Sequence, residues 1–506
     1  MAIAKRAVSQ PTSLPAPTGG WNARDSLANM NPQDAVTLQN WFPATTECTL
    51  RSGYSVWASG ITGQVETLMA YSGGNTTELF AIANGKVYDV STKGAVGAAV
   101  VTGLSNSRWG YCNIATGAGT FLSMANGVDA PYLYDGTAWT TPTITGITAT
   151  TLRDPILYAQ RQFFIEDNSL KVWYLPVDSI AGAAQFVNVS AIATRGGYIV
   201  SHGTWTIDAG QGVNDHYVIM TSRGQVIVYQ GIDPADIATW SMVGVWDIGA
   251  PIGHKALYKY AGDMLVICED GLLPLSGALQ SSRVQPKVAL SDKIQYAISE
   301  AITDYGQNYG WQVIYVPTIN QLWLNVPFQE GSQQQQFVMN TITGAWCNYT
   351  GWNVNCFEIF NDRPYMGGNG FVGLAYDGDS DAGANVQAYC MQAFSTFGNP
   401  GLLKRFTMSR PIFRTNGLPS VYAGINVDFN ISDVTEPLTF SPTPYGRWDV
   451  DKWDATLWGG GLGVLQNWQG LTGVGYYGAP VVKIASQGLQ VRWVSTDIVI
   501  EGGAIL

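Results

Sequence analysis

One turn recurs in the first half of the chain at a fixed interval. Asn84, Asn126 and Asn168 lie 42 positions apart, each between two short apolar segments. An Asn-Gly pair favours the tight turn of a β-hairpin, because both residues accept a positive φ. A repeat of about 40 residues built from strand, turn and strand is typical of the blades of a β-propeller. We therefore predict an all-β chain that contains a propeller.

Similar turns continue along the chain at wider and less regular intervals. They fall at Arg223-Gly224, Asp270-Gly271, Gly331 and Gly370. The series predicts about seven blades, with six or eight left open, and the wider intervals predict insertions. Tandem β-sandwiches would also give short strands, but they would not repeat one turn at a fixed interval.

One of these insertions is predicted to be a helix over residues 291–302. Ser291 or Asp292 is suited to cap its N-terminus. The apolar residues of the segment recur every three or four positions and so form one stripe along the helix. They are Ile294, Ala297, Ile298, Ala301 and Ile302.

The chain is poor in charge and rich in glycine and aromatic residues. Charged residues make up 12% of the 506 positions, against about 25% in an average domain, and there are 58 Gly, 18 Trp and 25 Tyr. Two explanations stay open: neighbouring subunits cover much of the exterior, or the aromatic residues fill a β-rich core. The net charge of −11 excludes a tight nucleic-acid clamp, which needs a basic surface, but not weak contact with a sliding duplex.

Six cysteines are scattered along the chain without any C-x-x-C pair: Cys48, Cys112, Cys268, Cys347, Cys356 and Cys390. This spacing predicts free thiols in a reducing compartment. The first residues lack the apolar segment of a signal peptide, and the sequence has no run of 18 apolar residues. We therefore expect a soluble protein or part of a soluble assembly, without a membrane-spanning segment.

Composition divides the chain into three parts. Residues 1–58 begin with Lys5, Arg6 and several prolines, and we predict that they form an extended N-terminal arm and a latch for the propeller. Residues 59–383 form the predicted propeller. Residues 384–506 contain alternating segments that predict a second β domain, a small sandwich or barrel.

The histidines and clustered aspartates give no clear metal site. His202, His216 and His254 have no His or Cys neighbour at metal-ligand spacing, so a structural role is favoured for each. One group of aspartates alternates as in a calcium loop, but the glutamate that such a loop needs at its twelfth position is absent. A solvated linker is favoured for that group, and an acidic rim for a second group. The two groups are Asp377, Asp379 and Asp381, and Asp449, Asp451 and Asp454.

The carboxylates do not identify a glycosidase either. Retaining enzymes need two carboxylates at a fixed separation, and nothing singles out a pair among Glu78, Glu166, Asp263, Glu269 and Glu300. Residues 135–139 and 343–346 are slightly similar to the turn boxes of sialidase propellers, which are structural. No nucleophile elbow and no P-loop occurs. We predict that the chain is not an enzyme and has no catalytic, cofactor-binding or metal-binding residue.

Several segments resemble the tail hub or nozzle proteins of short-tailed bacteriophages. One is residues 19–43, from Gly-Gly-Trp-Asn-Ala-Arg-Asp to Asn-Trp-Phe-Pro, followed by Leu-Arg-Ser-Gly-Tyr at 50–54. Another is residues 397–406, together with Arg410-Pro411. The Trp-Asp repeat at 448–458 is also similar to late segments of such proteins. With the propeller between them, the resemblance covers most of the chain.

The resemblance implies a hexameric ring in the virion tail, below the head-to-tail adaptor, through which the double-stranded genome passes. It also implies that the ring retains packaged DNA together with a needle or plug, and that it anchors fibres or spikes. Six copies would carry a formal charge of −66, which suits an acidic lumen that DNA crosses without binding. We expect residues 1–20 to reach the adaptor and residues 41–54 to help close the propeller.

Two other functional classes stay open. A glycan-cleaving propeller would pair two acids in a central funnel. A lectin-like, glycan-binding propeller would expose a tryptophan at the top of each blade, with Trp109, Trp139, Trp173, Trp240 and Trp346 as candidates. A monomer in solution would suit either class, whereas a stable hexamer supports the nozzle.

Overall fold

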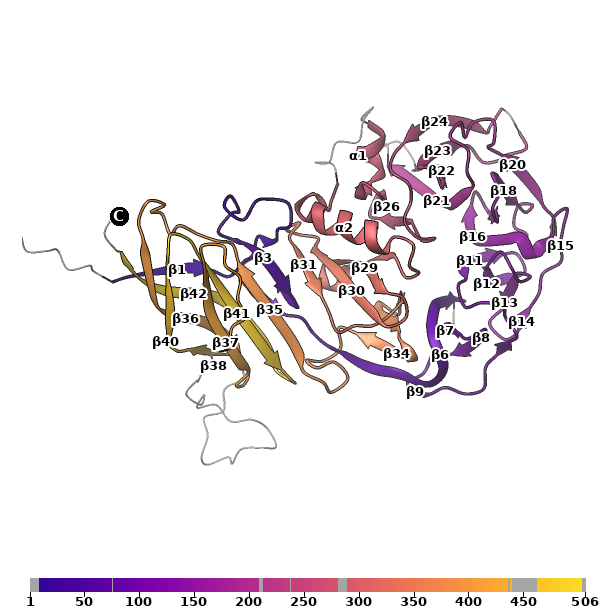
Figure 1. The fold of residues 1–506 in the computed structure, drawn as a ribbon. Coiled ribbons are helices and arrows are strands. Elements are labelled where there is room, and N and C mark those ends of the chain that lie inside the picture. The colour runs from indigo at the N-terminus through magenta and orange to yellow at the C-terminus, as the bar shows by residue number, and fades with distance from the viewer. Residues whose placement is uncertain are drawn as a thin grey trace, which may run out of the picture.

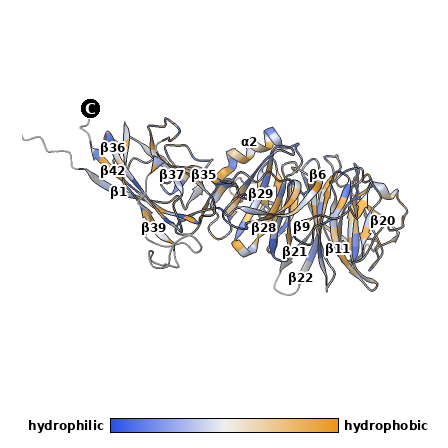
Figure 2. Cartoon of the chain, turned by 90° about the horizontal axis from the view of Figure 1, so that it is seen from below, coloured by the Kyte–Doolittle hydropathy of each residue, from blue (hydrophilic) through white to orange (hydrophobic). Residues whose placement is uncertain are grey.

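The computed structural model describes residues 9–502 apart from residues 75, 209–212, 237, 281–288, 436 and 439–461. This part of the chain is all-β, with two short α-helices. Its strands form a propeller-like ring at one end and a two-layer unit at the other (Figure 1). Apolar residues lie along the strands of both parts (Figure 2).

The ring is built from antiparallel sheets in which consecutive strands are neighbours. One sheet contains β11 (Gly110–Thr116), β12 (Gly119–Ala125), β13 (Tyr132–Tyr134) and β14 (Trp139–Thr140). The next contains β16 (Leu152–Tyr158), β17 (Arg161–Glu166), β18 (Lys171–Tyr174) and β20 (Gln185–Asn188). A third contains β21 (Ile199–Asp208), β22 (Val213–Thr221), β23 (Gln225–Gln230) and β24 (Ser241–Asp247). Then follow β25 (Leu257–Tyr260), β26 (Asp263–Cys268) and β27 (Gly271–Pro274), and after them β28 (Gln312–Val316), β29 (Gln321–Gln329), β30 (Gln333–Asn340) and β31 (Trp346–Tyr349).

The ring closes through one long strand, β6 (Tyr54–Ser72), which belongs to both ends of the propeller. Its second half pairs with β7 (Thr77–Ala83), which is followed by β8 (Lys86–Asp89) and β10 (Val101–Thr102). Its first half pairs with β34 (Asn369–Ala375), which is joined to β33 (Arg363–Gly367) and β32 (Cys356–Phe360). Of residues 41–54, which were expected to help close the propeller, only Tyr54 belongs to the closing strand, and the strands β4 and β5 within residues 41–50 lie in the two-layer unit.

The recurring turns join the second and third strands of their sheets. Asn84 and Gly85 have φ angles of 48° and 66° between β7 and β8, as the hairpin turn requires. A Cβ on Gly85 would lie 2.3 Å from the carbonyl oxygen of Leu104. Asn168 has a φ of 53° between β17 and β18, and Gly224 has a φ of 76° between β22 and β23. The propeller prediction is confirmed at the level of this arrangement.

The predicted helix forms, preceded by a tight turn. The turn η3 (Asp292–Ile294) leads into α2 (Gln295–Tyr305), and Ile294, Ile298 and Ala301 are buried on one side. Neither proposed cap residue bonds the start of α2; the Ser291 hydroxyl instead accepts a hydrogen bond from the Leu272 N–H. A second helix, α1 (Leu275–Gln280), directly follows β27 and was not expected.

The two-layer unit contains strands from both ends of the chain. One layer contains β1 (Gln10–Pro15), β4 (Trp41–Pro43), β5 (Cys48–Leu50), β36 (Lys404–Thr415), β39 (Gly463–Gln466), β40 (Gln469–Gly475) and β42 (Val491–Gly502). The other contains β2 (Gly20–Trp21), β3 (Asp34–Gln39), β35 (Val386–Gln392), β37 (Ser420–Val427), β38 (Pro437–Leu438) and β41 (Gly478–Ser486). Remaining short elements are β9 (Gly94–Ala95), β15 (Ile144–Thr145), β19 (Gly182–Ala183), η1 (Ala149–Thr151) and η4 (Pro317–Ile319).

Part of the predicted N-terminal arm belongs to a sheet of the two-layer unit. Residues 10–15 pair with β42 along their whole length, and Leu14 is buried against Phe406 and Ile498. The prolines of this segment do not prevent pairing, because a strand at a sheet edge needs hydrogen bonds on one side only. Residues 1–8 lie outside the described residues.

The ring and the two-layer unit share one sheet and one core. β3 lies between β31 of the ring and β35 of the two-layer unit, so the sheet runs from one part into the other. A single buried cluster includes Trp323 and Trp352 on the ring side and Trp41 and Trp493 on the other. This continuity favours a fixed orientation of the two parts.

Candidate functional site

Arg51 lies where the ring meets the two-layer unit, and its side chain is completely buried. Its guanidinium donates hydrogen bonds of 2.6 and 2.8 Å to the two carboxylate oxygens of Asp381. It also donates to the side-chain oxygen of Asn40 at 2.8 Å and to the carbonyl oxygen of Thr350 at 2.7 Å. The guanidinium carbon lies 4.9 Å from the centre of the Trp352 ring. A planar, permanently charged group held from several directions fixes the geometry of this junction.

The Leu-Arg-Ser-Gly-Tyr motif thus has a structural explanation. Arg51 supplies the ion pair, and Tyr54 begins β6. Gly53 lies so close to Ser380 that a Cβ would come within 1.8 Å of the carbonyl oxygen. The motif thus joins two segments of the chain that are far apart in the sequence.

The Gly-Gly-Trp-Asn-Ala-Arg-Asp motif is a second anchor. The Asn22 amide donates to Asp34 at 2.8 Å, and the Lys293 ammonium lies 2.6 Å from the same carboxylate. Arg24 forms an ion pair with Asp292. Because Asp292 and Lys293 belong to η3, this motif ties the N-terminal segment to the start of the inserted helix.

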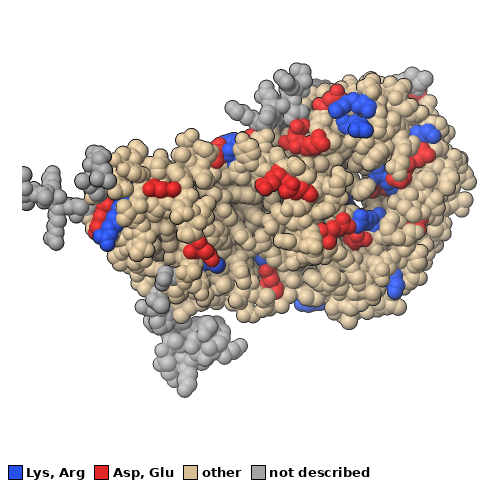
Figure 3. Space-filling view, in the orientation of Figure 1, with Lys and Arg blue, Asp and Glu red and all other residues tan. Residues whose placement is uncertain are grey.

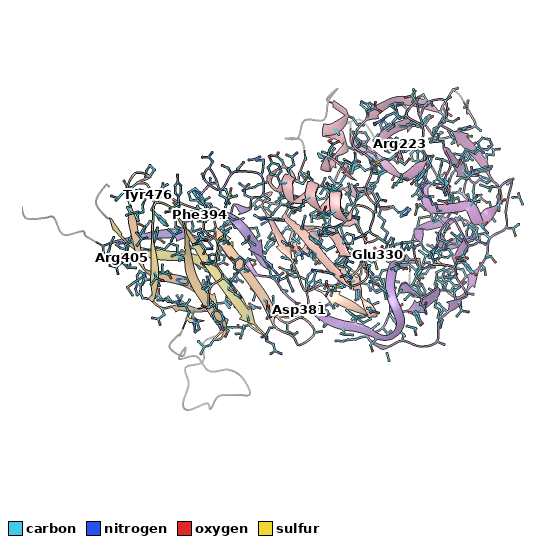
Figure 4. The ribbon with its side chains drawn as sticks, in the orientation of Figure 1. Arg223, Glu330, Asp381, Phe394, Arg405 and Tyr476 are labelled. Carbon is cyan, nitrogen blue, oxygen red and sulfur yellow. The ribbon has the colours of Figure 1, made fainter. Side chains whose placement is uncertain are left out.

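Charged side chains from separate sheets meet at the centre of the ring. Arg108 lies just before β11; its Nε is 3.0 Å from Glu66 of β6, and the guanidinium also pairs with Glu330 in the β29–β30 turn. The guanidinium carbon lies 4.2 Å from the centre of the Tyr309 ring, and the Tyr309 hydroxyl donates to the Glu66 carbonyl oxygen at 2.8 Å. Figure 3 shows acidic and basic groups around the central hollow, and Figure 4 places Glu330 beside it. These contacts join sheets on different sides of the ring.

Three titratable groups from three further positions interact in the same region. Burial raises the pKa of Glu358 on β32, while a hydrogen bond with Tyr111 of β11 and the charge of Lys255, just before β25, act in the opposite direction. Burial, aided by the charge of Glu358, raises the pKa of the Tyr111 hydroxyl. A titratable group displaced from its ordinary pKa in a concave place is a common marker of a functional site. In chemical terms, the residues of this and the preceding paragraph are the strongest candidate in the described chain. We call them the axial cluster: Glu66, Arg108, Glu330, Tyr111, Lys255 and Glu358.

The residues of the axial cluster were not predicted from the sequence. The five carboxylates that it considered lie at β7, β17, β26, the β26–β27 turn and α2, and no hydrogen bond or ion pair of the described chain links any two of them. A usable signal was available for Glu358: it is the one charged residue in the otherwise apolar segment Cys-Phe-Glu-Ile-Phe of β32.

The histidines lie in different environments. His202 is buried, with Nδ1 2.5 Å from the Tyr217 hydroxyl oxygen and Nε2 2.5 Å from the Asp154 carbonyl oxygen. Burial lowers its pKa to about 4, so the ring is neutral at physiological pH. His216 is buried on β22, and His254 is exposed before β25.

The tryptophans considered for glycan binding face inward. Trp109, Trp173 and Trp346 are buried, and the Trp346 indole donates to the Leu290 carbonyl oxygen at 3.0 Å. Trp139 and Trp240 are half-buried and pack on aromatic rings of their own sheets. None of the five presents an open aromatic face.

The segment 377–383 is held in place by hydrogen bonds and ion pairs of Asp377 and Asp381. Asp377 accepts a hydrogen bond from the Ser55 hydroxyl at 2.6 Å and lies 3.1 Å from Arg363, while Asp381 pairs with Arg51. The interpretation as a solvated linker was therefore wrong, because each of these two carboxylates meets a partner supplied by a distant part of the chain. The second aspartate group and the Trp-Asp repeat at 448–458 lie outside the described residues.

Within the described ranges, no group of three His, Cys, Asp or Glu side chains is arranged to hold a metal ion. No described helix has the length and apolar character needed to cross a membrane. All six cysteines are free thiols, and burial raises the pKa of Cys48, Cys112, Cys268 and Cys356.

Comparisons with known proteins do not show a family for this chain. No protein-family model matches the chain, and no curated protein matches it. A solved complex of BBS1N with ARL6DN is 12% identical, with 64% of this chain and 97% of that chain covered and a TM-score of 0.40. The β-propeller domain of Myceliophteria thermophila Cps50 (Swd1) is 11% identical, with 63% and 98% covered and a TM-score of 0.39. The computationally designed Ika8 protein is 10% identical, with 64% and 99% covered and a TM-score of 0.37.

Proposed function

We propose that the chain is a structural protein of a virion tail, a nozzle or hub that forms a hexameric ring below the head-to-tail adaptor. The observation that carries this proposal is the uneven distribution of charge over the fold. Residues 54–383, which build the ring, hold 26 acidic and 14 basic residues and so have a net charge of −12. The rest of the chain has a net charge of +1. All of the excess negative charge thus belongs to the propeller part.

An acidic surface suits a passage for DNA. It repels phosphates, so a duplex passes without the counterion release that drives tight binding. The nearly neutral two-layer unit is better suited to contacts between copies, since it lacks a strong like-charge repulsion. The buried Arg51–Asp381 pair supports this proposal further, because a regular ring of copies needs the two parts of each copy in one orientation.

We also propose the finer architecture. Seven groups of antiparallel strands, beginning at β6, β11, β16, β21, β25, β28 and β32, are the proposed blades, with the first half of β6 completing the last one. The two-layer unit is the proposed C-terminal β-sandwich, built on residues 384–506 and joined by strands from residues 10–50.

The proposed partners follow from the same role. They are five further copies of this chain, the head-to-tail adaptor, a needle or plug that helps retain the genome, and fibres or spikes. Duplex DNA is a transient, non-specific partner in the lumen. The protein is assembled in the host cytoplasm and acts in the virion without catalytic activity.

One observation supports a second candidate, a glycan-cleaving propeller. Glu358 interacts with the Tyr111 hydroxyl and with the charge of Lys255, so an acid, a hydroxyl and an ammonium act on one another. That candidate predicts release of reducing sugar from host polysaccharide, and loss of the release in Glu358→Gln. The glycan-binding candidate has less support, because its five tryptophans face inward.

Immunogold labelling of purified phage particles tests the virion role. Antibody against this chain is expected to label the tail just below the head, on every intact particle. Label on the capsid alone, or particles of normal composition without label, would overturn the proposal.

A further inference from the structure

The outer face of one sheet in the two-layer unit carries two ordered rows of side chains. In the first row Glu501 of β42, Arg405 of β36 and Val474 of β40 lie opposite one another. In the second row Arg492, Arg414 and Val464 correspond to them on β42, β36 and β39. Because side chains alternate along a strand, the buried Phe406 and Phe413 next to these arginines show that both rows point outward.

These side chains are well exposed. The exposed fraction of the side chain is 70% for Arg405, 47% for Arg414 and 42% for Arg492. Val464 and Val474 are exposed to 60% and 59%, among the highest values for apolar residues in the described chain. We call this surface the arginine face: Arg405, Arg410, Arg414, Arg492, Val464 and Val474. Figure 4 shows Arg405 toward the end of the molecule opposite the ring.

Carboxylates already accompany the arginines. Arg492 and Arg414 share Glu47 at 2.9 and 3.8 Å. Arg405 lies 3.9 Å from Glu501, and Arg410 lies 2.5 Å from Asp497. Four cations and three anions leave a weak positive excess. The Arg410 guanidinium also covers the ring of Trp468 at 4.6 Å.

This composition favours a protein partner over a nucleic acid. The cores of protein interfaces are enriched in arginine, aromatic and apolar residues and depleted of lysine and acids. Binding to duplex DNA instead draws its affinity from basic groups that are free to replace counterions. Here each arginine is already paired, and exposed valines add nothing to a phosphate contact.

The same chain offers an acidic counterpart. On α2, Tyr296, Glu300 and Asp304 are spaced four residues apart and so share one face of the helix. All three are exposed, Tyr296 to 69%, and neither carboxylate takes part in an ion pair within the described ranges. The helix belongs to the part of the chain with a net charge of −12.

We propose that the arginine face of one copy docks on the α2 face of a neighbouring copy. Different surfaces of identical chains then meet, which is the heterologous contact that generates closed rings when its rotation closes. This inference rests on the proposed hexamer and assigns the contact between its subunits. Arginine over tyrosine and arginine against carboxylate are the pairings that such a contact supplies.

Charge reversal and charge exchange test the inference. Sedimentation velocity over a concentration series, at low and high salt, measures self-association of the full chain. Arg405→Glu combined with Arg414→Glu is expected to weaken association by at least about tenfold. Adding Glu300→Arg and Asp304→Arg to that variant is expected to restore it. Arg223→Glu is the matched control, because it makes the same change at an exposed turn of the ring (Figure 4).

A second variant separates lost binding from lost folding. Val464→Ser with Val474→Ser leaves every charge in place, and it too is expected to weaken association while thermal unfolding stays near that of the wild type. If the wild type self-associates and neither variant changes this, the proposed docking contact is wrong, whereas the proposed hexamer is not contradicted. Loss of duplex DNA binding in the charge variant without loss of self-association would also overturn it. A wild-type chain that stays monomeric in all conditions, with and without the adaptor, would overturn both the proposed docking contact and the proposed hexamer.

Discussion

Arg51 and Asp381 are separated by 330 positions in the chain and are joined by two hydrogen bonds of 2.6 and 2.8 Å. The pair lies where the last ring strand leads into the two-layer unit. It is supported by Asn40 and Thr350, which come from both sides of the junction. Ring and two-layer unit therefore meet through a buried, fully hydrogen-bonded charge rather than through apolar packing alone.

Asp381→Asn is expected to lower the free energy of unfolding by about 3 kcal/mol, because it leaves the Arg51 guanidinium buried without its counter-charge. Urea denaturation followed by tryptophan fluorescence measures this directly. Lys483→Met is the control: Lys483 pairs with Asp433 at 3.1 Å, but both side chains are largely exposed. An equal effect of the two substitutions would contradict the role given to the buried pair.

Gly85→Ala is expected to destabilise the first hairpin of the ring by more than about 1 kcal/mol. Gly85 has a φ of 66°, and the added methyl group would meet the Leu104 carbonyl oxygen. Gly97→Ala is the matched control, since no atom lies within 4 Å of a Cβ at that position. The midpoints of thermal unfolding of the two variants are compared with that of the wild type. An unchanged midpoint for Gly85→Ala would contradict the assigned turn.

Acid should destabilise the chain partly through His202. Its pKa is about 4 in the folded chain and about 6.5 when unfolded. The unfolded state therefore takes up the proton first, and this contribution to stability is lost as the pH falls from about 6.5 toward 4. Between pH 7.5 and 5 the loss amounts to about 2 kcal/mol. His202→Gln should remove that part of the pH dependence in urea titrations, and an unchanged slope would contradict it.

The charge distribution predicts weak contact with DNA. Fluorescence anisotropy with a labelled duplex at physiological salt should give a dissociation constant no tighter than about 10⁻⁴ M, the weak end of non-specific binding. The net charge is −11 for the full chain and −12 for residues 54–383, so the overall electrostatic interaction with phosphates is repulsive. Submicromolar binding would contradict the argument for a sliding surface.

Local features of the fold were predictable from the sequence, because their causes lie within a few residues. Asn84 and Gly85 have the positive φ angles that their hairpin requires, and the apolar stripe of residues 294–302 has the spacing of one buried helix face. The 42-residue interval of the turns was sufficient to indicate a propeller.

Contacts between residues far apart in the sequence could not be predicted in this way. Nothing near Arg51 indicates that its partner is Asp381, and nothing in residues 10–15 indicates that β42 covers them. The axial residues Glu66, Arg108 and Glu330 converge only because the ring closes. The contacts of Asp377 and Asp381 could not be predicted for the same reason, since Arg363, Ser55 and Arg51 lie more than ten residues away.

Light scattering of the purified chain, by itself and mixed with the head-to-tail adaptor, measures whether the protein forms a hexamer. We expect a particle of six copies of the 54.5 kDa chain, formed either spontaneously or on the adaptor. A monomer that ignores the adaptor at every concentration would contradict it.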